Sequence, residues 1–276
     1  MTDVITDRQV ERWLREDVGH HDVTNDVPGE TEGRLVTKAS GVVAGLDAAA
    51  AVFDYLDCAV TRTVETGERV AAGETVLRVE GPARDVLRGE RVAVNVAGHA
   101  SGIATRTREA VERARDRNPA VRVAATRKTT PGLRGVEKRA VAAGGGDTHR
   151  LDLSHAVIVK DNHVAELGLE AATRRTADRV SFVTTVEVEV EEPADAPHAV
   201  AAGADAVLLD NMTPAAVERA VGLVADTNTD TDVALEASGG VTLETVSEYA
   251  ATGVDVVSMG SLTHSAPAMD YSFGTG

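Results

Sequence analysis

The second half of the chain repeats one pattern, in which a short apolar run is followed by a longer amphipathic stretch of helical character. The apolar runs lie at residues 121–126, 156–160, 183–190, 206–210, 233–236 and 254–258. Their first residues are 21 to 35 positions apart, which leaves room for one helix between successive strands. Parallel strands need crossover connections of this kind. The rhythm therefore predicts a parallel sheet or a β/α barrel.

Charged or polar residues stand at the ends of these expected strands. The strand-end groups are Thr126-Arg127-Lys128, Lys160-Asp161-Asn162, Glu187, Glu189, Asp210-Asn211, Glu236 and Ser258. In β/α barrels the carboxyl ends of the strands face the active site. One such residue would be an ordinary loop residue by default, but a series in register predicts converging side chains and a catalytic or ligand site.

Glycine-containing turns follow the last two expected strands, at Ser238-Gly239-Gly240 and at Gly260-Ser261. Barrels often bind phosphate in the loops after their final two strands, where glycines leave backbone N–H groups accessible. Either turn alone is explained by a tight connection. Two turns at the expected positions favour a phosphate site.

Residues 1 to about 100 have a different organisation. A helix is expected to start at Thr6 or Asp7, because either side chain can cap it. Residues 60–64 and 75–79 alternate apolar and polar side chains, as half-buried strands do. A long helix over residues 86–117 is expected to lead into the repeating part. The first part of the chain therefore predicts a small α+β domain.

The composition limits the class of protein. The 276 residues suffice for one large or two moderate domains, and 43% apolar content is ordinary for a globular protein. No run of about 18 apolar residues is present, so a membrane span is not expected. Cys58 is the single cysteine, which excludes an internal disulfide and favours a small buried apolar residue. The start of the chain lacks the pattern of a signal peptide, so a cytoplasmic location is expected.

The formal net charge is −16, and the 28 basic residues comprise four lysines and 24 arginines. A surface with this charge repels nucleic acids and anionic membranes, so neither is an expected partner. An acid-rich, lysine-poor chain favours a halophilic-type surface, adapted to a cytoplasm with a high salt concentration.

One segment departs from this acidic background. Residues 122–160 contain eight basic and three acidic residues, a net charge of +5. A solvated basic helix face would explain such a segment, but a positive island in an acidic protein also indicates an anionic ligand.

The candidate site residues form two groups of opposite charge. The basic group is Arg127, Lys128, His149, Arg150 and Lys160, and the acidic group is Glu189 and Asp210. Guanidinium groups match planar carboxylates, so the basic group suits a small polycarboxylate. Two carboxylates near a phosphate loop suit Mg²⁺. No Walker A loop, dinucleotide-binding glycine motif, nucleophile elbow or plausible zinc spacing is present.

Together, these motifs resemble the signature of the quinolinate phosphoribosyltransferase family (nicotinate-nucleotide pyrophosphorylase, carboxylating). The most specific segments are residues 126–134, TRKTTPGLR, and residues 160–163, KDNH. Other similar segments include Glu90-Arg91, Gly144-Gly145-Gly146, His149-Arg150, Glu187-Val188-Glu189-Val190, Leu209-Asp210-Asn211, Glu236-Ala237-Ser238-Gly239-Gly240 and Gly260-Ser261-Leu262-Thr263-His264-Ser265. The resemblance follows the order of the chain and covers nearly all of it.

The resemblance implies an α/β fold, in which an N-terminal α/β sandwich domain is joined to an incomplete, open TIM-like β/α barrel. It implies a sandwich domain at residues 1–105 that includes the C-terminal tail, 264–276, and a barrel domain at residues 106–263. It also implies a homodimer, or a multiple of one, in which Arg91 completes the active site of the neighbouring subunit.

The resemblance also implies the roles of individual residues. The implied substrate-binding residues are Arg91, Thr126, Arg127, Lys128, His149, Arg150, Lys160, Glu189, Asp210, Ser238, Gly239, Gly240, Gly260 and Ser261. Of these, the residues implied to hold the two carboxylates of quinolinate are Arg127, His149, Arg150 and Lys160. Lys128, Glu189 and Asp210 are the implied catalytic residues, and the two acids are implied to hold Mg²⁺, directly or through water.

The implied activity is transfer of a phosphoribosyl group from phosphoribosyl pyrophosphate to quinolinate with loss of CO₂. This reaction gives nicotinate mononucleotide for NAD biosynthesis and is expected to need no organic cofactor, because the pyridinium formed is itself an electron sink.

Three other interpretations remain open on the sequence. A paralogous pyrophosphorylase-like protein associated with molybdenum would share most of the motifs. Lys160 ends a strand, so a Schiff-base barrel lyase is a second possibility. A third treats residues 67–73, which resemble a turn of a small hammerhead-like β unit, as part of a carrier or binding module; no lysine stands there, and the strand-end charges would be unexplained.

Overall fold

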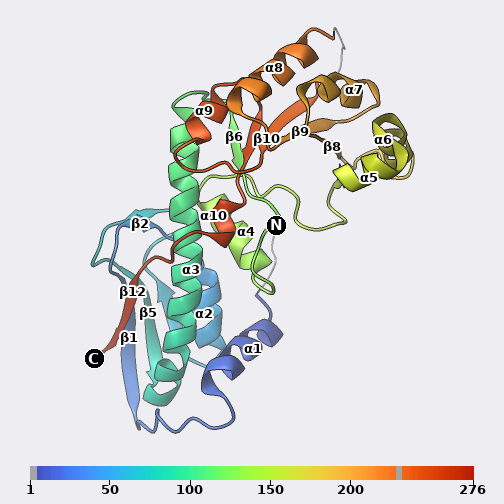
Figure 1. Cartoon of the computed structure of the whole chain (residues 1–276). Helices are drawn as coiled ribbons and strands as arrows, with labels where there is room; N and C mark the ends of the chain where they lie inside the picture. The colour runs from blue at the N-terminus through green and yellow to red at the C-terminus, as the bar shows by residue number, and fades with distance from the viewer. Residues whose placement is uncertain (1–4, 228–231) are drawn as a thin grey trace. The chain divides into compact units, whose positions relative to one another are not determined.

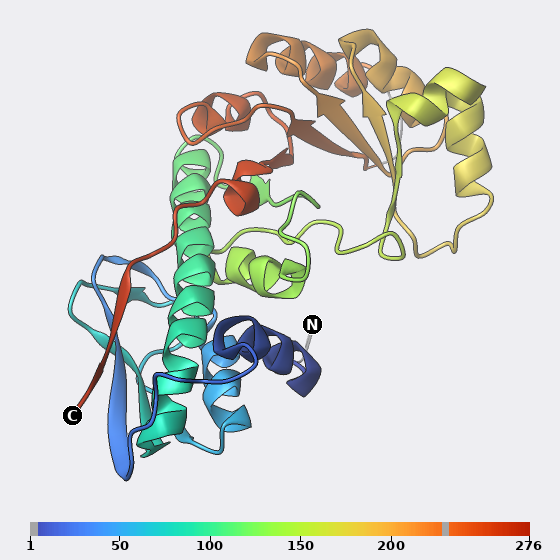
Figure 2. The same ribbon diagram turned by 60° about the horizontal axis from the view of Figure 1, so that its bottom comes forward.

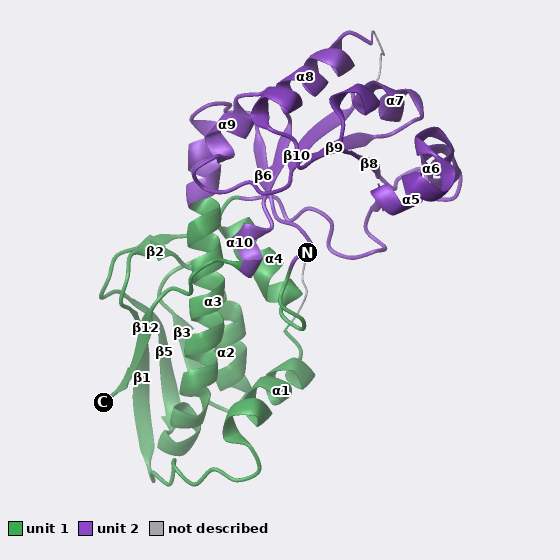
Figure 3. Cartoon of the chain, in the orientation of Figure 1, with its two compact units in different colours: residues 1–108, 129–145, 265–276 green, residues 109–128, 146–264 purple. Residues whose placement is uncertain are grey.

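The computed structural model describes residues 5–227 and 232–276. The expectation about the start of the chain therefore concerns residues 1–4, outside the described part. The chain divides into two compact units (Figure 3): residues 1–108, 129–145 and 265–276 form the first, and residues 109–128 and 146–264 the second. The division into domains at residues 105/106 and 263/264 stays a prediction. Each unit has its own hydrophobic core.

The first unit is built on a four-stranded antiparallel sheet in the order β12-β1-β5-β3. Its strands are β1 (Glu30–Thr37), β3 (Ala59–Arg62), β5 (Thr75–Pro82) and β12 (Tyr271–Thr275), and a separate ribbon pairs β2 (Gly41–Val42) with β4 (Arg69–Val70). Its helices are α1 (Asp7–Val18), α2 (Leu46–Tyr55), α4 (Arg134–Ala143) and most of α3 (Ala83–Arg115). The expected helices and strands of this region are thus present, with shifts of a few residues at their ends, but three of the four residues of β3 are exposed and not half-buried.

Apolar side chains from the sheet and α2 form the core of this unit. Leu35, Leu77 and Phe53 are fully buried in one cluster. Cys58 belongs to the same cluster, as expected for a small apolar residue. Burial, together with nearby carboxylates such as Asp85, raises the pKa of its thiol to about 11. This cysteine is therefore a structural and chemically inert residue.

The C-terminal tail belongs to the first unit. β12 pairs with β1 (Figure 1), and the Tyr271 hydroxyl lies 2.9 Å from the Ser101 hydroxyl on α3. Gly102 lets the tail approach α3, because a Cβ there would lie 2.0 Å from the carbonyl oxygen of Pro267. The implied return of the tail to the N-terminal sheet is therefore confirmed.

The second unit is built on a six-stranded sheet in the order β6-β11-β10-β9-β8-β7, and all its pairings are parallel. The strands are β6 (Arg122–Ala124), β7 (Val157–Val159), β8 (Val186–Val190), β9 (Ala206–Asp210), β10 (Ala234–Ser238) and β11 (Val256–Ser258). The helices between the strands are α5 (Asp161–Leu167), α6 (Leu169–Ala177), the short η1 (Pro193–Asp195), α7 (Ala196–Ala201), α8 (Pro214–Ala225) and α9 (Val246–Ala250), and α10 (Ser261–His264) follows β11.

All six strands predicted from the apolar runs are present. Strands β7 to β11 lie side by side in chain order, and β6 lies beside β11. In a closed barrel β6 would also pair with β7, but here the two form opposite edges. The sheet is therefore an open β/α barrel, as the resemblance implied. Figure 2 shows the helices of this unit gathered along its strands.

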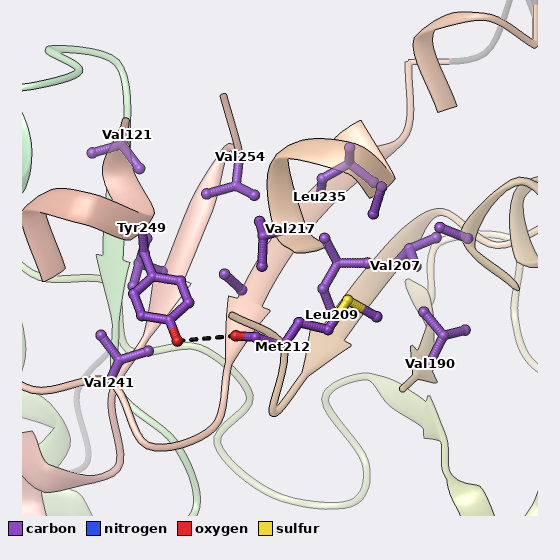
Figure 4. Close-up of a cluster of buried hydrophobic side chains, with 14 of the residues drawn as sticks. Val121, Val190, Val207, Leu209, Met212, Val217, Leu235, Val241, Tyr249 and Val254 are labelled. Carbon is purple, nitrogen blue, oxygen red and sulfur yellow. Dashed lines mark hydrogen bonds between the residues drawn. The ribbon is translucent and has the colours of Figure 1, made fainter. Parts of the chain in front are cut away.

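One face of this sheet packs against helices. Valines and leucines of the strands, among them Val207 and Leu209, form a cluster with Val217 of α8 and Tyr249 of α9 (Figure 4). The Tyr249 hydroxyl donates a hydrogen bond of 2.9 Å to the carbonyl oxygen of Met212, which satisfies both polar groups within the cluster. No helix in the described part of the chain has both the length and the apolar character needed to cross a membrane.

The Tyr249 hydrogen bond gives a test of this packing. Tyr249→Phe should lower the free energy of unfolding by about 1–2 kcal/mol, because it leaves a buried carbonyl without its donor. The same change at Tyr55, which is exposed on α2, should have little effect. Denaturant unfolding of both variants measures the difference, and equal losses would show that the Tyr249 hydroxyl is not a stabilising contact.

Candidate active site

The strand-end acids lie on one face of the parallel sheet. Side chains two residues apart on a strand share a face, so Glu187 and Glu189 of β8 point the same way. Glu187 is in register with Ala206 and Glu189 with Leu208 on β9, and Leu208 is in register with Glu236 on β10. Asp210 on β9 and Ser238 on β10 follow two residues later, are in register with one another, and so lie on the same face. This polar face is opposite the one that packs against α8 and α9.

A buried cluster of three ionisable side chains lies on this face. His149 comes from the loop before β7, and its Nε2 atom is 3.0 Å from Glu236 Oε2 and 3.8 Å from Glu187 Oε2. Both glutamates are only 5% exposed. Side chains from three distant segments of the chain therefore converge at one point.

The environment of this cluster changes the charge states of its members. Burial by itself lowers the pKa of His149, but the carboxylates of Glu187 and Glu236 outweigh it and raise the pKa to about 10. Burial and the neighbouring carboxylate of Glu236 raise the pKa of Glu187, although His149 opposes this. The two carboxylates therefore favour the protonated form of the His149 ring.

Lys160 and Glu189 form a second contact between opposite charges. Lys160 stands directly after β7, and its Nζ atom donates to Glu189 Oε2 at 2.5 Å. The lysine side chain is 47% exposed and the glutamate side chain 10% exposed. The side chain of Lys160 thus extends from the end of β7 to the acidic side chains of β8.

Two arginines of the basic group also lie near one another. Burial, and then the positive charge of Arg127, lowers the pKa of Arg150. The Nη1 atom of Arg150 donates to the carbonyl oxygen of Ala156 at 3.3 Å, but its buried Nε atom has no hydrogen-bond partner in the described part of the chain. A buried N–H donor without a partner lowers the stability of the fold. Arg150 Nε is therefore suited to donate a hydrogen bond to an acceptor atom of a ligand.

The two glycine turns bring backbone segments close to the polar face. Gly239 has a φ of +92°, and a Cβ there would lie 2.3 Å from Asn211 Oδ1 and 2.5 Å from Asn211 N. The turn after β10 is thus packed directly on the Asp210-Asn211 turn after β9. Gly260 lies beside the side chain of Lys128, because a Cβ there would lie 2.9 Å from Lys128 Cδ.

Two hydroxyls at the end of β11 are available for a ligand. The Oγ atoms of Ser258 and Ser261 are buried and have no hydrogen-bond partner among residues 5–227 and 232–276. Both flank Gly260, so hydroxyl donors and a glycine backbone occur together where the sequence predicted phosphate binding.

The donor set at Glu189 and Asp210 fits a divalent metal. The two residues are diagonal neighbours on β8 and β9 and share the polar face. Their carboxylate oxygens are the hard ligands that Mg²⁺ prefers. Asp210 Oδ2 accepts a hydrogen bond of 2.6 Å from Asn211 Nδ2, which fixes the orientation of the carboxylate.

Comparisons with known families identify this arrangement. The N-terminal domain of quinolinate phosphoribosyl transferase matches residues 21–101, and the C-terminal domain of the same family matches residues 103–274. The chain belongs to the quinolinate phosphoribosyl transferase family. The resemblance found in its motifs is thereby confirmed.

Individual members of the family are similar over nearly their full length. A probable nicotinate-nucleotide pyrophosphorylase [carboxylating] of Methanothermobacter thermautotrophicus is 44% identical over 268 residues, covering 95% of this chain and 96% of the relative. The nicotinate-nucleotide pyrophosphorylase [carboxylating] of Homo sapiens is 41% identical over 266 residues, covering 95% and 89%. The solved nicotinate-nucleotide pyrophosphorylase of Francisella tularensis has a TM-score of 0.91 at 31% identity and covers 100% of this chain and 98% of that structure.

Most residues that the family resemblance implied for substrate binding lie in the second unit. The members of this set are Thr126, Arg127, Lys128, His149, Arg150, Lys160, Glu189, Asp210, Ser238, Gly239, Gly240, Gly260 and Ser261. Arg91 is the exception, because it lies on α3 in the first unit with a side chain that is 60% exposed. Its use by a neighbouring subunit stays a prediction.

The basic island is divided between the two units. Its residues Arg134, Lys138 and Arg139 lie on α4 in the first unit, where Arg139 pairs with Asp47 and Lys138 is almost fully buried. Only the remaining basic residues, such as Arg127 and Arg150, belong to the unit of the polar face. Net charge along the sequence therefore combined residues that belong to different units.

Two features of this family member were not assigned a role from the sequence. Glu187 and Glu236 stood among the strand-end residues, but their convergence on His149 depends on the strand order and register. Asn211, with a φ of +55°, lies so close to Gly239 that a side chain at position 239 would clash with it. The alternation of glutamates with valines at residues 186–190 was the signal in the sequence that Glu187 and Glu189 share a face.

The contact between Gly239 and Asn211 leads to a prediction. Gly239→Ala should destabilise the protein by more than the roughly 1–2 kcal/mol that a positive φ costs a non-glycine residue, because its Cβ would meet the Asn211 backbone. Gly240→Ala is the matched control, because Gly240 has a φ of +65° and a Cβ there would meet nothing within 4 Å. Equal losses of unfolding free energy in the two variants would contradict this steric explanation.

Proposed function

We propose that this chain catalyses the transfer of a phosphoribosyl group from phosphoribosyl pyrophosphate to quinolinate, with release of pyrophosphate and CO₂. The product would be nicotinate mononucleotide, a precursor of NAD. The observation that carries the proposal is the basic cluster beside a row of acids on one face of the barrel. That cluster occurs in a chain similar over 95% of its length to proteins named nicotinate-nucleotide pyrophosphorylase [carboxylating].

The basic group would bind the two carboxylates of quinolinate. Arg127 and Arg150 lie close enough to affect one another electrostatically, and guanidinium forks suit planar carboxylates. The imidazolium of His149 adds a further donor. Thr126 orients the start of the same loop, because its hydroxyl accepts a hydrogen bond of 3.1 Å from the Lys128 N–H.

The phosphoribosyl group would bind at the ends of β9, β10 and β11. Gly239, Gly240 and Gly260 would offer backbone N–H groups to the 5′-phosphate, and the hydroxyls of Ser238 and Ser261 would add donors. Glu189 and Asp210 would hold the ribose hydroxyls and a divalent metal, directly or through water. When bound, Mg²⁺ would supply charge stabilisation for the departing pyrophosphate.

The chemistry then follows from charge and position. Loss of pyrophosphate leaves positive character on C1 of the ribose, which Glu189 and Asp210 stabilise electrostatically. Lys128, beside Gly260, stabilises negative charge between the two substrates. The pyridine nitrogen forms the bond to C1, and the positive charge of the resulting pyridinium stabilises the electron pair left on C2 as the 2-carboxylate leaves as CO₂. A proton from water then binds at C2, which completes nicotinate mononucleotide. Much of the rate enhancement comes from holding two mutually repelling anions in place.

Several finer features belong to the same proposal. The enzyme would act as a homodimer, or a multiple of one, with Arg91 contributed to the neighbouring site, and would need no organic cofactor. The domains would correspond to residues 1–105 with 264–276 and to residues 106–263. The excess of acidic residues would keep the enzyme soluble at the salt concentration of its cytoplasm.

The alternative enzymes are less consistent with the geometry. A Schiff-base lysine needs a desolvated amine, whereas Lys160 is 47% exposed and bonded to Glu189. Borohydride trapping of a substrate on Lys160 would support that alternative. A paralogue associated with molybdenum would share the phosphoribosyl site, and the complete basic group for two carboxylates favours quinolinate over that substrate.

A product assay tests the proposed function. The protein is incubated with quinolinate, phosphoribosyl pyrophosphate and Mg²⁺ in concentrated KCl, with nicotinate as the control acid. Formation of nicotinate mononucleotide and CO₂ with quinolinate alone is the expected result. Activity should be lost with a chelator and restored by Mg²⁺. No product from folded protein with either acid would contradict the proposal and favour the paralogue.

Arg150→Ala should weaken quinolinate binding by about tenfold to a hundredfold, because a charged hydrogen bond contributes roughly 1.5–3 kcal/mol. Titration calorimetry with quinolinate measures the change. Arg219→Ala, at an exposed position on α8, is the control for loss of one positive charge. Unchanged affinity in Arg150→Ala would remove this residue from the carboxylate-binding group.

The proposed sharing of active sites can be tested by complementation. Arg91→Ala should abolish activity, whereas mixing it with a second inactive variant, Lys128→Ala, should restore part of it. In a mixed dimer one site would keep both Arg91 and Lys128. Absence of any recovery, with exchange of subunits verified by labelled protein, would contradict a shared site.

A further inference from the structure

The cluster of His149, Glu187 and Glu236 uses only one of the two nitrogen atoms of the histidine ring. Nε2 faces both carboxylates, at 3.0 Å from Glu236 and 3.8 Å from Glu187. In the described ranges Nδ1 makes no hydrogen bond, because the hydrogen bonds donated or shared by His149 use Nε2 and the backbone N–H. The second ring nitrogen is therefore available to a ligand.

The backbone around His149 is held in an uncommon conformation. His149 has a φ of +52°, in the left-handed region that costs a non-glycine residue about 1–2 kcal/mol. Its N–H donates to Asp147 Oδ1 at 2.7 Å, and Asp147 is itself bridged to β6 through backbone hydrogen bonds with Val123 and Ala125. Strain that is maintained by the surrounding structure is typical of functional sites.

We propose that Glu187 and Glu236 are positioning residues, which hold His149 as an imidazolium and direct its Nδ1–H to a carboxylate of the pyridine substrate. This inference rests on the proposed function of the chain. The two glutamates would act through His149 and not through contact with the substrate, so their role differs from that of Glu189 and Asp210.

Charge explains why two buried carboxylates are useful beside an anion-binding site. A neutral imidazole has one N–H, and the tautomer bonded to Glu236 through Nε2–H would present a lone pair at Nδ1, which repels a carboxylate. An imidazolium donates from both nitrogens. The other charged groups near the cluster are Arg150 and Asp147, and Arg127 lies close to Arg150. The raised pKa of His149 is consistent with the imidazolium form.

The same three side chains could in principle bind a metal, because one ligand atom from each lies within 4.8 Å of the others. An imidazolium has no lone pair for a metal at Nε2, and the ring is hydrogen-bonded there to Glu236. A proton and a metal ion at Nε2 therefore exclude one another. A metal site is kept as one outcome of the test.

NMR spectroscopy of the histidine rings tests the charge state independently of the reaction. Protein labelled with ¹⁵N-histidine is measured at pH 8, where an unperturbed histidine with a pKa of about 6.5 is neutral. His149→Gln assigns the signal of this ring. Both nitrogens of His149 should be protonated at pH 8, and a neutral ring would overturn the proposal. A neutral ring whose signals move on addition of Zn²⁺ would establish a metal site instead.

Substrate binding tests the positioning role. In the double variant Glu187→Gln/Glu236→Gln, the pKa of His149 should fall, so the ring becomes neutral at pH 8 and is protonated again as the pH is lowered. Quinolinate affinity should therefore fall at least about tenfold at pH 8 and recover in part at pH 6. The exposed pair Glu218→Gln/Glu248→Gln, on α8 and α9, is the matched control.

The outcomes separate this inference from the proposed function. An equal loss of affinity at both pH values would indicate structural damage and overturn the positioning role. If the double variant does not fold, Glu236→Gln alone is measured in the same way, with a lowered His149 pKa as the expected result and an unchanged pKa as the contradicting one. Failure of the wild-type protein to bind quinolinate would contradict the proposed function, while the NMR result would still decide the charge state.

Discussion

The strict alternation of side chains along the parallel strands is the constraint on which the second unit depends. In β8 the sequence Val186-Glu187-Val188-Glu189-Val190 directs three valines to the helices and two glutamates to the other face. A slip of one residue would bury both carboxylates in the apolar cluster and expose the valines. Fold and site are thus specified by the same few residues, since the pattern that forms the core also places the acids.

Several carboxylates on one face of a sheet need partners that offset their negative charge. Each of the four acids of the polar face has a positively charged or amide neighbour from a connecting segment: Lys160 for Glu189, Asn211 for Asp210, and His149 for both Glu236 and Glu187. Buried charges are costly unless they are paired and hydrogen-bonded. The connecting segments of the barrel therefore supply the substrate-binding groups. They also supply the partners that lower the free-energy cost of burying acids on the strands.

The sequence predicted the strands well because each apolar run is short and followed by polar residues. It also predicted the polar strand ends, since a barrel brings the carboxyl ends of its strands together. It could not predict which acids meet. Glu187 and Glu236 are 49 residues apart, and their approach depends on β9 lying between β8 and β10. The placement of Lys138 on α4 in the first unit likewise depends on long-range packing that local charge does not encode.

The pairing of β12 with β1 has a consequence for the order of events during synthesis. β1 contains residues Glu30–Thr37, but its edge partner, Tyr271–Thr275, follows all six barrel strands in the chain. Chains grow at about 5–20 residues per second, and domains commonly fold as they emerge. All six barrel strands leave the ribosome before the N-terminal sheet can gain its last strand. That sheet must therefore keep an unpaired edge while residues 38–270 are made, and gains its last strand only after residues 271–275 have left the ribosome.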